Sequence, residues 1–335
     1  MKAVLFPLKP MAHFHFGEIS VDEKMDISTT SAYPHSDTLF SALINSFAQN
    51  HTVIQNEELI NDFKSGKTII SSMFYYLNIR EQFIFFLPKP LSISSKIVDS
   101  RFYKQLRKID FISEQVWLTI KDANDFFDPG KCFIIQNKFV VLASEVDADI
   151  VDEINIYNET TQPKVPIRWN DKDASIYFET DIEIGVNSNI PDLIEVGYYF
   201  LYSSDNPKPL IEAIEMMALT GIGGGRSTGT GQLGSPNFED NVLNSFESID
   251  AKNLCSISLS VPADGPDFEL FDLYETKIRG GRKMEIGKQN FIRMIKEGAI
   301  LKGKARGKLV ELGHDERNNI VYRNGKCFLI PVYSL

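Results

Sequence analysis

Apolar and polar residues follow two different spacings near the start of the chain. Residues 2–9 alternate as a half-buried β-strand does, and strand-like runs also occupy residues 68–79 and 83–87. Between them, a helix is predicted from an apolar face at helical spacing, made by Leu39, Phe40, Leu43, Ile44 and Phe47. Ser36 or Asp37 is suited to cap the free N–H groups at its start. The pattern therefore begins as strand, helix, strand, strand.

The middle of the chain, residues 90–165, shows no steady period. Its clearest feature is a predicted hairpin, with strands at residues 132–135 and 139–142 on either side of the polar segment Gln136-Asn137-Lys138. We expect this stretch to consist of insertions into a first domain.

From residue 166 the succession of elements starts again. Strands are predicted at residues 176–184 and 194–202, and a helix begins at Pro207, since proline is tolerated in the first helical turn. Gly221 is expected to end this helix as a left-handed cap. Further strands are predicted at residues 255–261, 268–277 and 321–332.

Each half of the chain thus combines one main helix with several strands. This composition fits an α+β fold of two ferredoxin-like (RRM-like) domains with a glycine-rich loop and β-hairpin insertions. The expected domains are residues 1–165, which carry the insertions, and residues 166–335, which carry the glycine-rich loop. A length of 335 residues and a hydrophobic content of 43% are consistent with two packed cores.

The charge of the chain is unevenly distributed. Between Lys277 and Lys308, eleven basic residues stand beside two acidic ones, so this segment carries +9 while the remainder carries −19. A basic segment in an acidic chain can bind phosphates locally, and the acidic remainder can face a basic protein partner. The alternative interpretation of the basic segment is a solvated, lysine-rich surface.

Other features exclude several classes of protein. No apolar run is long enough for a membrane helix, and Pro7 interrupts the first apolar run too early for a signal peptide, so we expect a cytoplasmic protein. Three widely spaced cysteines form no metal-ligand pair, and the histidines show no metal-ligand spacing. We therefore expect no metal and no other cofactor.

A glycine-rich loop follows the second predicted helix and is the strongest functional feature. Six glycines lie between Gly221 and Gly231. Glycine readily adopts positive φ, so successive N–H groups can converge on an anion. Arg226 adds a guanidinium group suited to phosphate oxygens. The loop residues expected to bind phosphate are Gly221, Gly223, Gly224, Gly225, Arg226, Ser227, Thr228 and Gly229.

Three known glycine motifs do not fit this loop. A dinucleotide-binding fingerprint needs a strand before it and a helix after it, whereas this loop follows a helix. A Walker loop needs a glycine at a spacing that is missing before Gly225-Arg226-Ser227. The run Gly225–Gly229 matches G-x-S-x-G, but a nucleophile elbow also requires the strand-to-helix order. The loop is therefore interpreted as a binding loop, with a plain surface loop as the alternative.

A second anion site is expected at the start of the first helix. There, His35 and Ser36 adjoin free N–H groups that can meet a phosphate. Alternatively, His35 could serve as the general base of an RNA-cleaving enzyme, with His13 or His15 as a second group. No carboxylate pair accompanies these residues, so binding is the favoured interpretation.

Several segments together resemble a known family, the RAMP proteins of CRISPR systems. The glycine-rich loop resembles the RAMP signature, and four further segments resemble motifs of the fourth subunit of the type III-A (Csm) effector complex. These segments are His35-Ser36-Asp37-Thr38-Leu39-Phe40-Ser41-Ala42-Leu43, Arg279-Gly280-Gly281-Arg282, Arg293-Met294-Ile295-Lys296-Glu297-Gly298-Ala299 and the final strand from Val321 to Pro331. Ala299 departs from the usual serine. The matches keep the order of the family, and residues 90–165 are unmatched.

The resemblance implies two RRM-like domains and no catalytic centre. It implies a subunit that binds the repeat-derived 5′ handle of the crRNA and contacts target RNA through the guide. The implied protein partners are the large Cas-ten-type subunit and a backbone RAMP subunit of the Csm complex. It also implies a β-hairpin thumb, which we expect within residues 80–140. The expected RNA-binding set then also includes Arg279, Arg282, Lys283 and Arg293.

These features of the sequence allow three functions. The first is a non-catalytic subunit that grips a guide-RNA handle, and it is favoured. The second is a repeat-processing endoribonuclease that uses His35. The third is a nucleotide-binding enzyme that uses the glycine-rich loop, and the missing Walker and dinucleotide-binding contexts argue against it.

Overall fold

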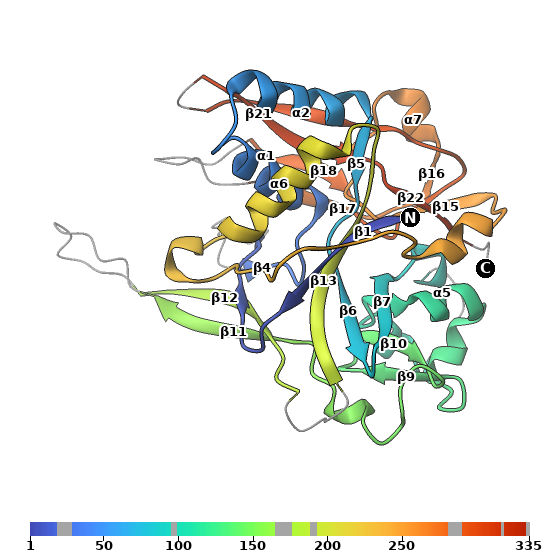
Figure 1. Cartoon of the computed structure of the whole chain (residues 1–335). Helices are drawn as coiled ribbons and strands as arrows, with labels where there is room; N and C mark the ends of the chain where they lie inside the picture. Colours follow the sequence, from blue (N-terminus) through green and yellow to red (C-terminus); the bar gives the residue numbers. More distant parts are fainter. Residues whose placement is uncertain are drawn as a thin grey trace.

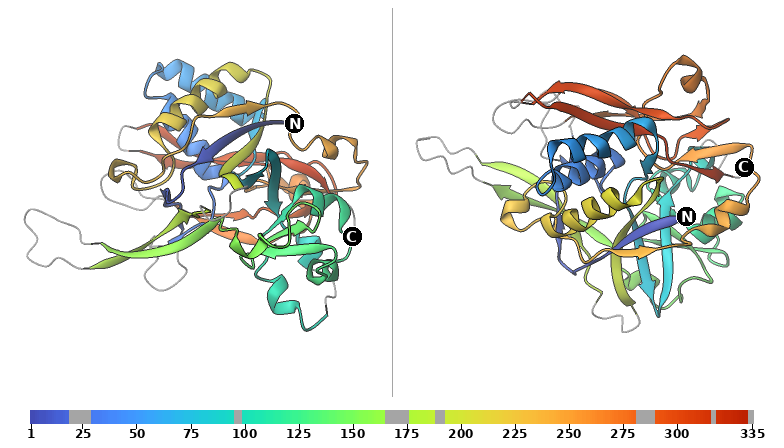
Figure 2. Two further views of the ribbon diagram at one scale, coloured as in Figure 1. Left: turned by 60° about the horizontal axis from the view of Figure 1, so that its bottom comes forward. Right: turned by 45° about the horizontal axis from the view of Figure 1, so that its top comes forward.

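A computed structural model gives the fold of residues 1–18, 29–94, 99–164, 176–187, 193–280, 290–315 and 318–332. It is a mixed α/β structure. Figure 1 shows a central sheet with helices packed near it and one long hairpin projecting from the body. The C-terminal strands lie beside the first two helices, as the right-hand view of Figure 2 shows.

The central sheet joins strands that are far apart in the sequence. Its first part has the strand order β14-β1-β13-β6, and each neighbouring pair is antiparallel. In chain order the elements run strand, helix, strand, strand, helix, strand, which is the succession of a ferredoxin-like unit. They are β1 (Lys2–Leu8), α1 (Ser36–Phe47), β6 (Phe74–Ile79), β13 (Leu193–Ser204), α6 (Pro207–Thr220) and β14 (Asn237–Glu239).

This pairing crosses the domain boundary that was expected between residues 165 and 166. β13 pairs with β1 along its length, from Lys2 opposite Tyr202 to Leu8 opposite Val196. α6 packs against α1. Both β13 and α6, which were expected in the C-terminal domain, therefore lie in one unit with β1 and α1. Periodicity identifies a strand but does not identify its pairing partner, so the sequence pattern could not place this boundary.

The inserted segment extends the same sheet beyond β6. The further strand order is β7-β8-β10-β9, and a short strand, β5 (Thr68–Ile70), pairs with β13. The hairpin predicted between residues 132 and 142 is confirmed as β9 and β10. The elements of this segment are β7 (Gln82–Pro88), α3 (Leu91–Ser94), α4 (Tyr103–Leu106), β8 (Phe111–Ser113), α5 (Glu114–Thr119), β9 (Cys132–Ile135) and β10 (Phe139–Leu142).

The projecting hairpin consists of β11 (Tyr157–Lys164) and β12 (Tyr177–Ile184), which pair antiparallel over eight residues each. Its base pairs with the short strand β2 (His13–Phe14). In Figure 1 it extends away from the body at the left. The strands within residues 80–140, where a thumb hairpin was expected, extend the central sheet instead.

The C-terminal residues form small sheets of their own. One has the order β16-β19-β15-β22, and two hairpins pair β17 with β18 and β20 with β21. β20 and β21 contact α2 (Val53–Ser65) and α1 respectively. The elements are β15 (Asn253–Ser256), α7 (Gly265–Glu269), β16 (Phe271–Leu273), β17 (Thr276–Arg279), β18 (Ile292–Ile295), β19 (Ile300–Leu301), β20 (Gly307–His314), β21 (Ile320–Lys326) and β22 (Leu329–Val332).

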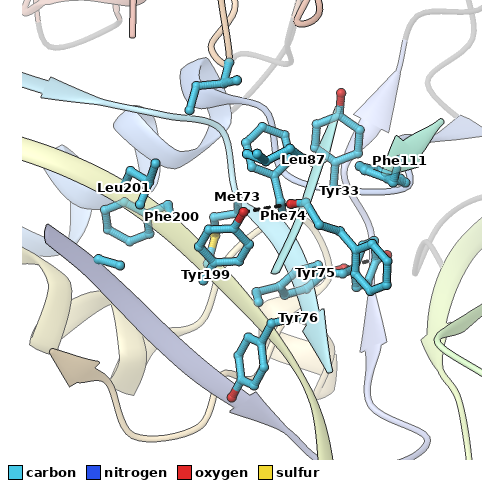
Figure 3. Packing of buried hydrophobic residues seen from close by; sticks show 14 of the residues in the cluster. Tyr33, Met73, Phe74, Tyr75, Tyr76, Leu87, Phe111, Tyr199, Phe200 and Leu201 are labelled. Atoms are coloured by element: carbon cyan, nitrogen blue, oxygen red, sulfur yellow. Dashed lines mark hydrogen bonds between the residues drawn. The ribbon is translucent and has the colours of Figure 1, made fainter. Parts of the chain in front are cut away.

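The centre of the core is rich in aromatic rings. Tyr75, Tyr198 and Tyr199 are fully buried, and Figure 3 shows Tyr75 and Tyr199 among their apolar neighbours. Their hydroxyl groups keep partners: Tyr199 donates to the Phe86 carbonyl at 2.7 Å, and Tyr198 donates to the Tyr75 oxygen at 3.2 Å. Each buried ring contributes on the order of 1.5–3 kcal/mol, and the satisfied hydroxyls avoid a desolvation cost. The abundant aromatic residues therefore serve mainly to fill the core.

Helix α2 was not predicted from the periodicity. Its exposed surface is mostly polar apart from Val53 and Ile54 in the first turn, and only Leu59 and Phe63 are buried. Its start does carry a local signal, because the Thr52 side chain accepts from the Gln55 N–H and Gln55 returns a bond to the Thr52 N–H. Among the described helices, none is long and apolar enough to cross a membrane.

Candidate nucleic-acid interface

The glycine-rich loop begins where α6 ends, at Gly221. Its two stems are buried, whereas the tip from Gly225 to Gly229 is exposed. Positive φ, as expected for the loop, is found at Gly221, Gly223, Gly225, Gly229 and Gly231. The ψ of 173° at Gly221 differs from the left-handed helical cap that was predicted there. The loop therefore leaves α6 in an extended direction and exposes its tip.

Two of these glycines are required by close backbone contacts. A Cβ at Gly231 would lie 2.2 Å from the Ile222 carbonyl oxygen, where the two stems face each other. A Cβ at Gly223 would lie 2.5 Å from the His15 carbonyl oxygen, where the loop rests on the segment after β2. In addition, the Gly224 N–H donates to the His15 carbonyl at 2.8 Å, and the Gly231 N–H donates to the His13 carbonyl at 2.7 Å. The stems are thus fixed on residues 13–15.

The tip of the loop has backbone donors that no protein group uses. Gly225 is in the left-handed region, and a single 3-10 turn follows at Arg226–Thr228. Within the described chain, no acceptor engages the N–H groups of Gly225, Arg226 or Ser227, and the Arg226 guanidinium makes no ion pair. Successive N–H groups in this conformation form a concave anion-binding nest. The tip can therefore bind a phosphate with backbone and side chain together.

The loop hydroxyl groups have separate roles. The Thr228 hydroxyl donates to the Gly225 carbonyl at 2.8 Å, and the Thr230 hydroxyl donates to the Gly224 carbonyl at 2.7 Å. These two bonds hold the turn closed, so they shape the nest. Ser227 is exposed and has no hydrogen-bond partner within the described chain. Its hydroxyl is thus the one of the three that is free to meet an anion.

The start of α1 is not a surface site. His35 is 1% exposed and Ser36 is fully buried. His35 Nδ1 lies 2.8 Å from Glu297 Oε1, and its Nε2 lies 3.1 Å from both Ser31 Oγ and Lys277 Nζ. The N–H of Ser36 donates to the Ser72 hydroxyl at 2.8 Å. Protein groups thus occupy the positions where a phosphate was expected.

Asp37 is the centre of a second buried cluster. Arg279 donates to both of its carboxylate oxygens, at 2.9 and 3.1 Å, and Arg323 donates to Oδ2 at 2.5 Å. Burial by itself would raise the pKa of Asp37, but the two guanidinium groups outweigh it and hold that pKa well below its usual range. Asp37 is therefore an ion-pair partner inside the first turn, and His35 occupies the cap position that was predicted for Ser36 or Asp37.

Glu297 and Glu18 complete this buried network. Burial favours the neutral form of Glu297, but its interactions with His35 and the hydrogen bond from Ser72 lower the pKa of Glu297 to about 2. Glu18 pairs with Lys277, and its pKa is also held below the usual range against the effect of burial. The motif residues His35, Asp37, Arg279, Glu297 and Arg323 thus meet in one place. We call these five residues, with Glu18 and Lys277, the motif network.

The described residues of the basic segment are divided between buried ion pairs and the surface. Lys277 and Arg279 are held inside the motif network, whereas Arg293 is exposed on β18 and donates to Thr276 Oγ1 at 3.3 Å. Arg306 and Lys302 pair with Asp264 and Asp272. Arg282 and Lys283, which were expected to bind RNA, lie outside the described residues. Of the four expected basic contacts after residue 270, Arg293 is the one that the described structure places on the surface.

The sequence reasoning did not identify His13 and His15 as parts of the loop site. Their backbone carbonyls hold the loop stems, and their rings face Glu183, Asp181 and Glu179 on β12. The alternation Glu179, Asp181, Glu183 was a usable signal, because alternate residues of a strand share one face. Its pairing with residues 13–15 was not visible in the sequence.

Comparisons with known proteins give one consistent answer. Residues 249–332 match the family model of the CRISPR Csm4 C-terminal domain. The chain is 29% identical over 203 residues to the CRISPR system Cms protein Csm4 of Thermococcus onnurineus (strain NA1), an alignment that covers 59% of this chain. It spans 61% of that relative's length.

Solved structures agree in fold. One similar chain, in the crystal structure of a Csm3–Csm4 subcomplex of the type III-A CRISPR-Cas interference complex, has a TM-score of 0.69, 19% identity and 99% coverage of both chains. Another, in a Csm1–Csm4 cassette in complex with cA4, has a TM-score of 0.55 and 21% identity, with 99% of this chain and 97% of that chain covered. At these identities the likeness concerns the fold. Together with the family model and the curated relative, it confirms the resemblance to the Csm4 subunit, and hence to the RAMP proteins, that the motifs of this chain indicated.

Proposed function

We propose that the chain is a non-catalytic crRNA-binding subunit of a type III-A CRISPR interference complex. The observation that carries this proposal is the exposed tip of the glycine-rich loop, where three successive N–H groups and Arg226 have no protein partner within the described chain. A phosphate-binding nest without base-reading groups suits a backbone held in a fixed place. We assign the 5′ handle of the crRNA as the ligand of this nest.

The proposed protein partners follow from the matched structures. Those structures are a Csm3–Csm4 subcomplex and a Csm1–Csm4 cassette. By likeness, the partners of this chain are a backbone RAMP subunit and the large Cas-ten-type subunit. We assign the projecting hairpin, on which Phe178 of β12 is 60% exposed, to contact with the guide–target duplex. Target RNA would therefore reach this chain through the guide.

The proposed domain organisation keeps two RRM-like units but moves the boundary. The first unit spans β1 to β14, because those strands share one sheet in ferredoxin-like order. The second unit corresponds to residues 249–332, which match the family model and form separate small sheets. The motif network joins the two, since His35 and Asp37 lie on the first and their partners Glu297, Arg279 and Arg323 on the second.

Geometry argues against the endoribonuclease alternative. A general base must come within hydrogen-bond reach of the proton that it removes. His35 is 1% exposed, and its ring nitrogens already face Glu297, Ser31 and Lys277. The same burial argues against His35 and Ser36 as direct RNA contacts. We retain the glycine-rich loop and Arg293 as the proposed RNA-binding residues.

The test is RNA binding by variants of the full chain. Arg226→Ala removes a charged donor from the tip and is expected to weaken single-stranded RNA binding at least about tenfold, because a hydrogen bond to a charged group contributes about 1.5–3 kcal/mol. If the wild type contacts about four to six phosphates, its log–log salt slope is roughly −3 to −4, and the variant slope is shallower by about 1. Arg107→Ala is the matched control, because Arg107 is also exposed but lies on another segment.

Co-purification completes the test. The tagged wild-type chain should bring down a large subunit, a backbone subunit and a guide RNA. Equal RNA affinity and salt slope in wild type and Arg226→Ala would show that the loop is not the phosphate site. An assembly that contains no RNA would contradict the proposed function as a whole.

A further inference from the structure

His13 and His15 lie directly beneath the glycine-rich loop. Their carbonyl oxygens accept from Gly231 and Gly224 at 2.7 and 2.8 Å. The His15 ring touches the loop itself, because a Cβ at Gly224 would lie 3.1 Å from His15 Cδ2. A change of charge on these rings therefore changes the electrostatic potential at the proposed phosphate site.

The other side of the two rings faces a row of carboxylates. Glu179, Asp181 and Glu183 alternate along β12 and so project from one face of it. His13 Nε2 lies 3.3 Å from Glu183 Oε2. His15 Nδ1 lies 3.2 Å from Asp181 Oδ1, and its Nε2 lies 3.7 Å from Glu179 Oε1. The histidines thus separate an acidic strand from a loop that should attract an anion.

Asp181 supplies a second, independent observation. Its side chain is 4% exposed, and its Oδ1 accepts no hydrogen bond within the described chain. His15 Nδ1 lies 3.2 Å from this oxygen but 2.9 Å from the Thr180 carbonyl oxygen, to which it donates its hydrogen. A buried carboxylate without a donor is costly unless a positive charge lies close by. A protonated His15 is the group placed to provide that charge.

The net charge around His13 and His15 depends on whether the two rings are protonated. The facing groups are Glu179, Asp181 and Glu183 on β12, with Lys164 of β11 paired to Glu179. β4 (Thr29–Thr30) contributes two uncharged threonines, and Glu18 of β3 (Gly17–Glu18) is held by Lys277. With both histidines neutral, the group of four charged side chains and two rings carries −2; with both protonated, it carries none.

We propose that His13 and His15 are part of the anion-binding site of the glycine-rich loop, and that their protonation shields the bound RNA phosphate from the carboxylates of β12. The inference rests on the proposed RNA-binding function of the loop. Protonation adds positive charge next to the phosphate, so affinity is highest at low pH and falls as pH rises and the rings lose their protons. For two charges at about 8–10 Å in a largely aqueous setting, the fall is about three- to fivefold.

The experiment measures binding of fluorescein-labelled oligouridine RNA to the full chain at constant ionic strength from about pH 5.5 to about pH 8.5. The double variant His13→Gln/His15→Gln removes both titrating rings and keeps polar side chains. Between the two ends of this pH range, the loss of RNA affinity should be about three- to fivefold smaller in the double variant than in the wild type. His51→Gln is the matched control, because His51 also pairs with a carboxylate, Glu212, but stands at the end of α1. It should keep the wild-type response.

A second variant tests the role of the carboxylates of β12 and leaves both histidines in the sequence. Glu183→Gln removes one negative charge from a partly exposed position, so affinity at about pH 8.5 should rise roughly twofold. The inference is overturned if the double variant keeps the full wild-type response or if Glu183→Gln leaves high-pH affinity unchanged. If these results occur while Arg226→Ala still weakens binding, the proposed function stands and the histidine inference alone fails. Binding that is insensitive to Arg226→Ala counts against the proposed function instead.

Discussion

The motif network and the glycine-rich loop look alike in the sequence but differ in the structure. Both combine arginine with small or polar residues, and both resemble family motifs. In the loop, Arg226 and three backbone N–H groups remain exposed without partners in the described chain. In the network, Arg279 and Arg323 are buried against Asp37. A motif can therefore be buried as part of the folded core in one place and leave its polar groups exposed in another, and burial distinguishes the two.

The largest expected effect is on stability, at Asp37. Asp37→Ala leaves two buried guanidinium groups without their carboxylate, and removing one partner of a buried ion pair costs about 3–5 kcal/mol. The free energy of unfolding, measured by urea denaturation, should fall by that amount. Asp240→Ala is the control, because Asp240 is exposed. A decrease in the free energy of unfolding below about 1 kcal/mol in Asp37→Ala would mean that the ion pairs of Asp37 stabilise the fold no more than exposed surface pairs do.

The decrease in the free energy of unfolding at acidic pH should depend on Glu297. Its folded-state pKa of about 2 lies below the ordinary value of 4.5, so its contribution is fully present above about pH 4.5 and is lost as pH falls toward 2. The contribution is on the order of 3 kcal/mol. Glu297→Gln should be less stable at neutral pH and should lose less stability on acidification, as measured by urea denaturation across this range. Parallel pH profiles for the two proteins would refute this assignment.

A smaller effect is expected on the loop side, at two glycines that share positive φ. Gly223→Ala meets the His15 carbonyl at 2.5 Å, whereas Gly229→Ala meets no atom within 4 Å. Both variants have backbone strain, on the order of 1 kcal/mol, but only the first must also move the loop stem. RNA affinity should therefore fall about tenfold in Gly223→Ala and at most about threefold in Gly229→Ala, and the unfolding midpoint should also fall further in Gly223→Ala. Equal losses of affinity would mean that the loop stem need not be fixed.

Local elements of the fold were predictable where one face carries the signal. The apolar face of α1, the hairpin β9–β10 and the alternation of β12 are each patterns that a short stretch of sequence carries by itself. The domain boundary was not predictable, because β1 and β13 are each plausible strands and nothing local says that they pair. α2 was missed since its surface is mostly polar and only two of its residues are buried, and β11 was not predicted since it is polar along most of its length.

The candidate site divides in the same way. Glycine-rich composition predicted the positive φ values of the loop, which are local properties. The burial of His35 and Arg279 depends on residues more than two hundred positions away, such as Glu297 for His35. A charged residue in a motif indicates equally well a ligand contact or an internal ion pair, so only the packing could decide between them.

The pairing of β1 with β13 also has a consequence for synthesis of the chain. Leu8 pairs with Val196, so the first strand leaves the ribosome long before its central partner exists. At about 5–20 residues per second, the delay is on the order of ten to forty seconds. During that interval the apolar strand Ala3–Phe6 has neither neighbour in the sheet. Newborn chains are then most exposed to aggregation, and a translational stop before Leu193 leaves the strand without its central partner.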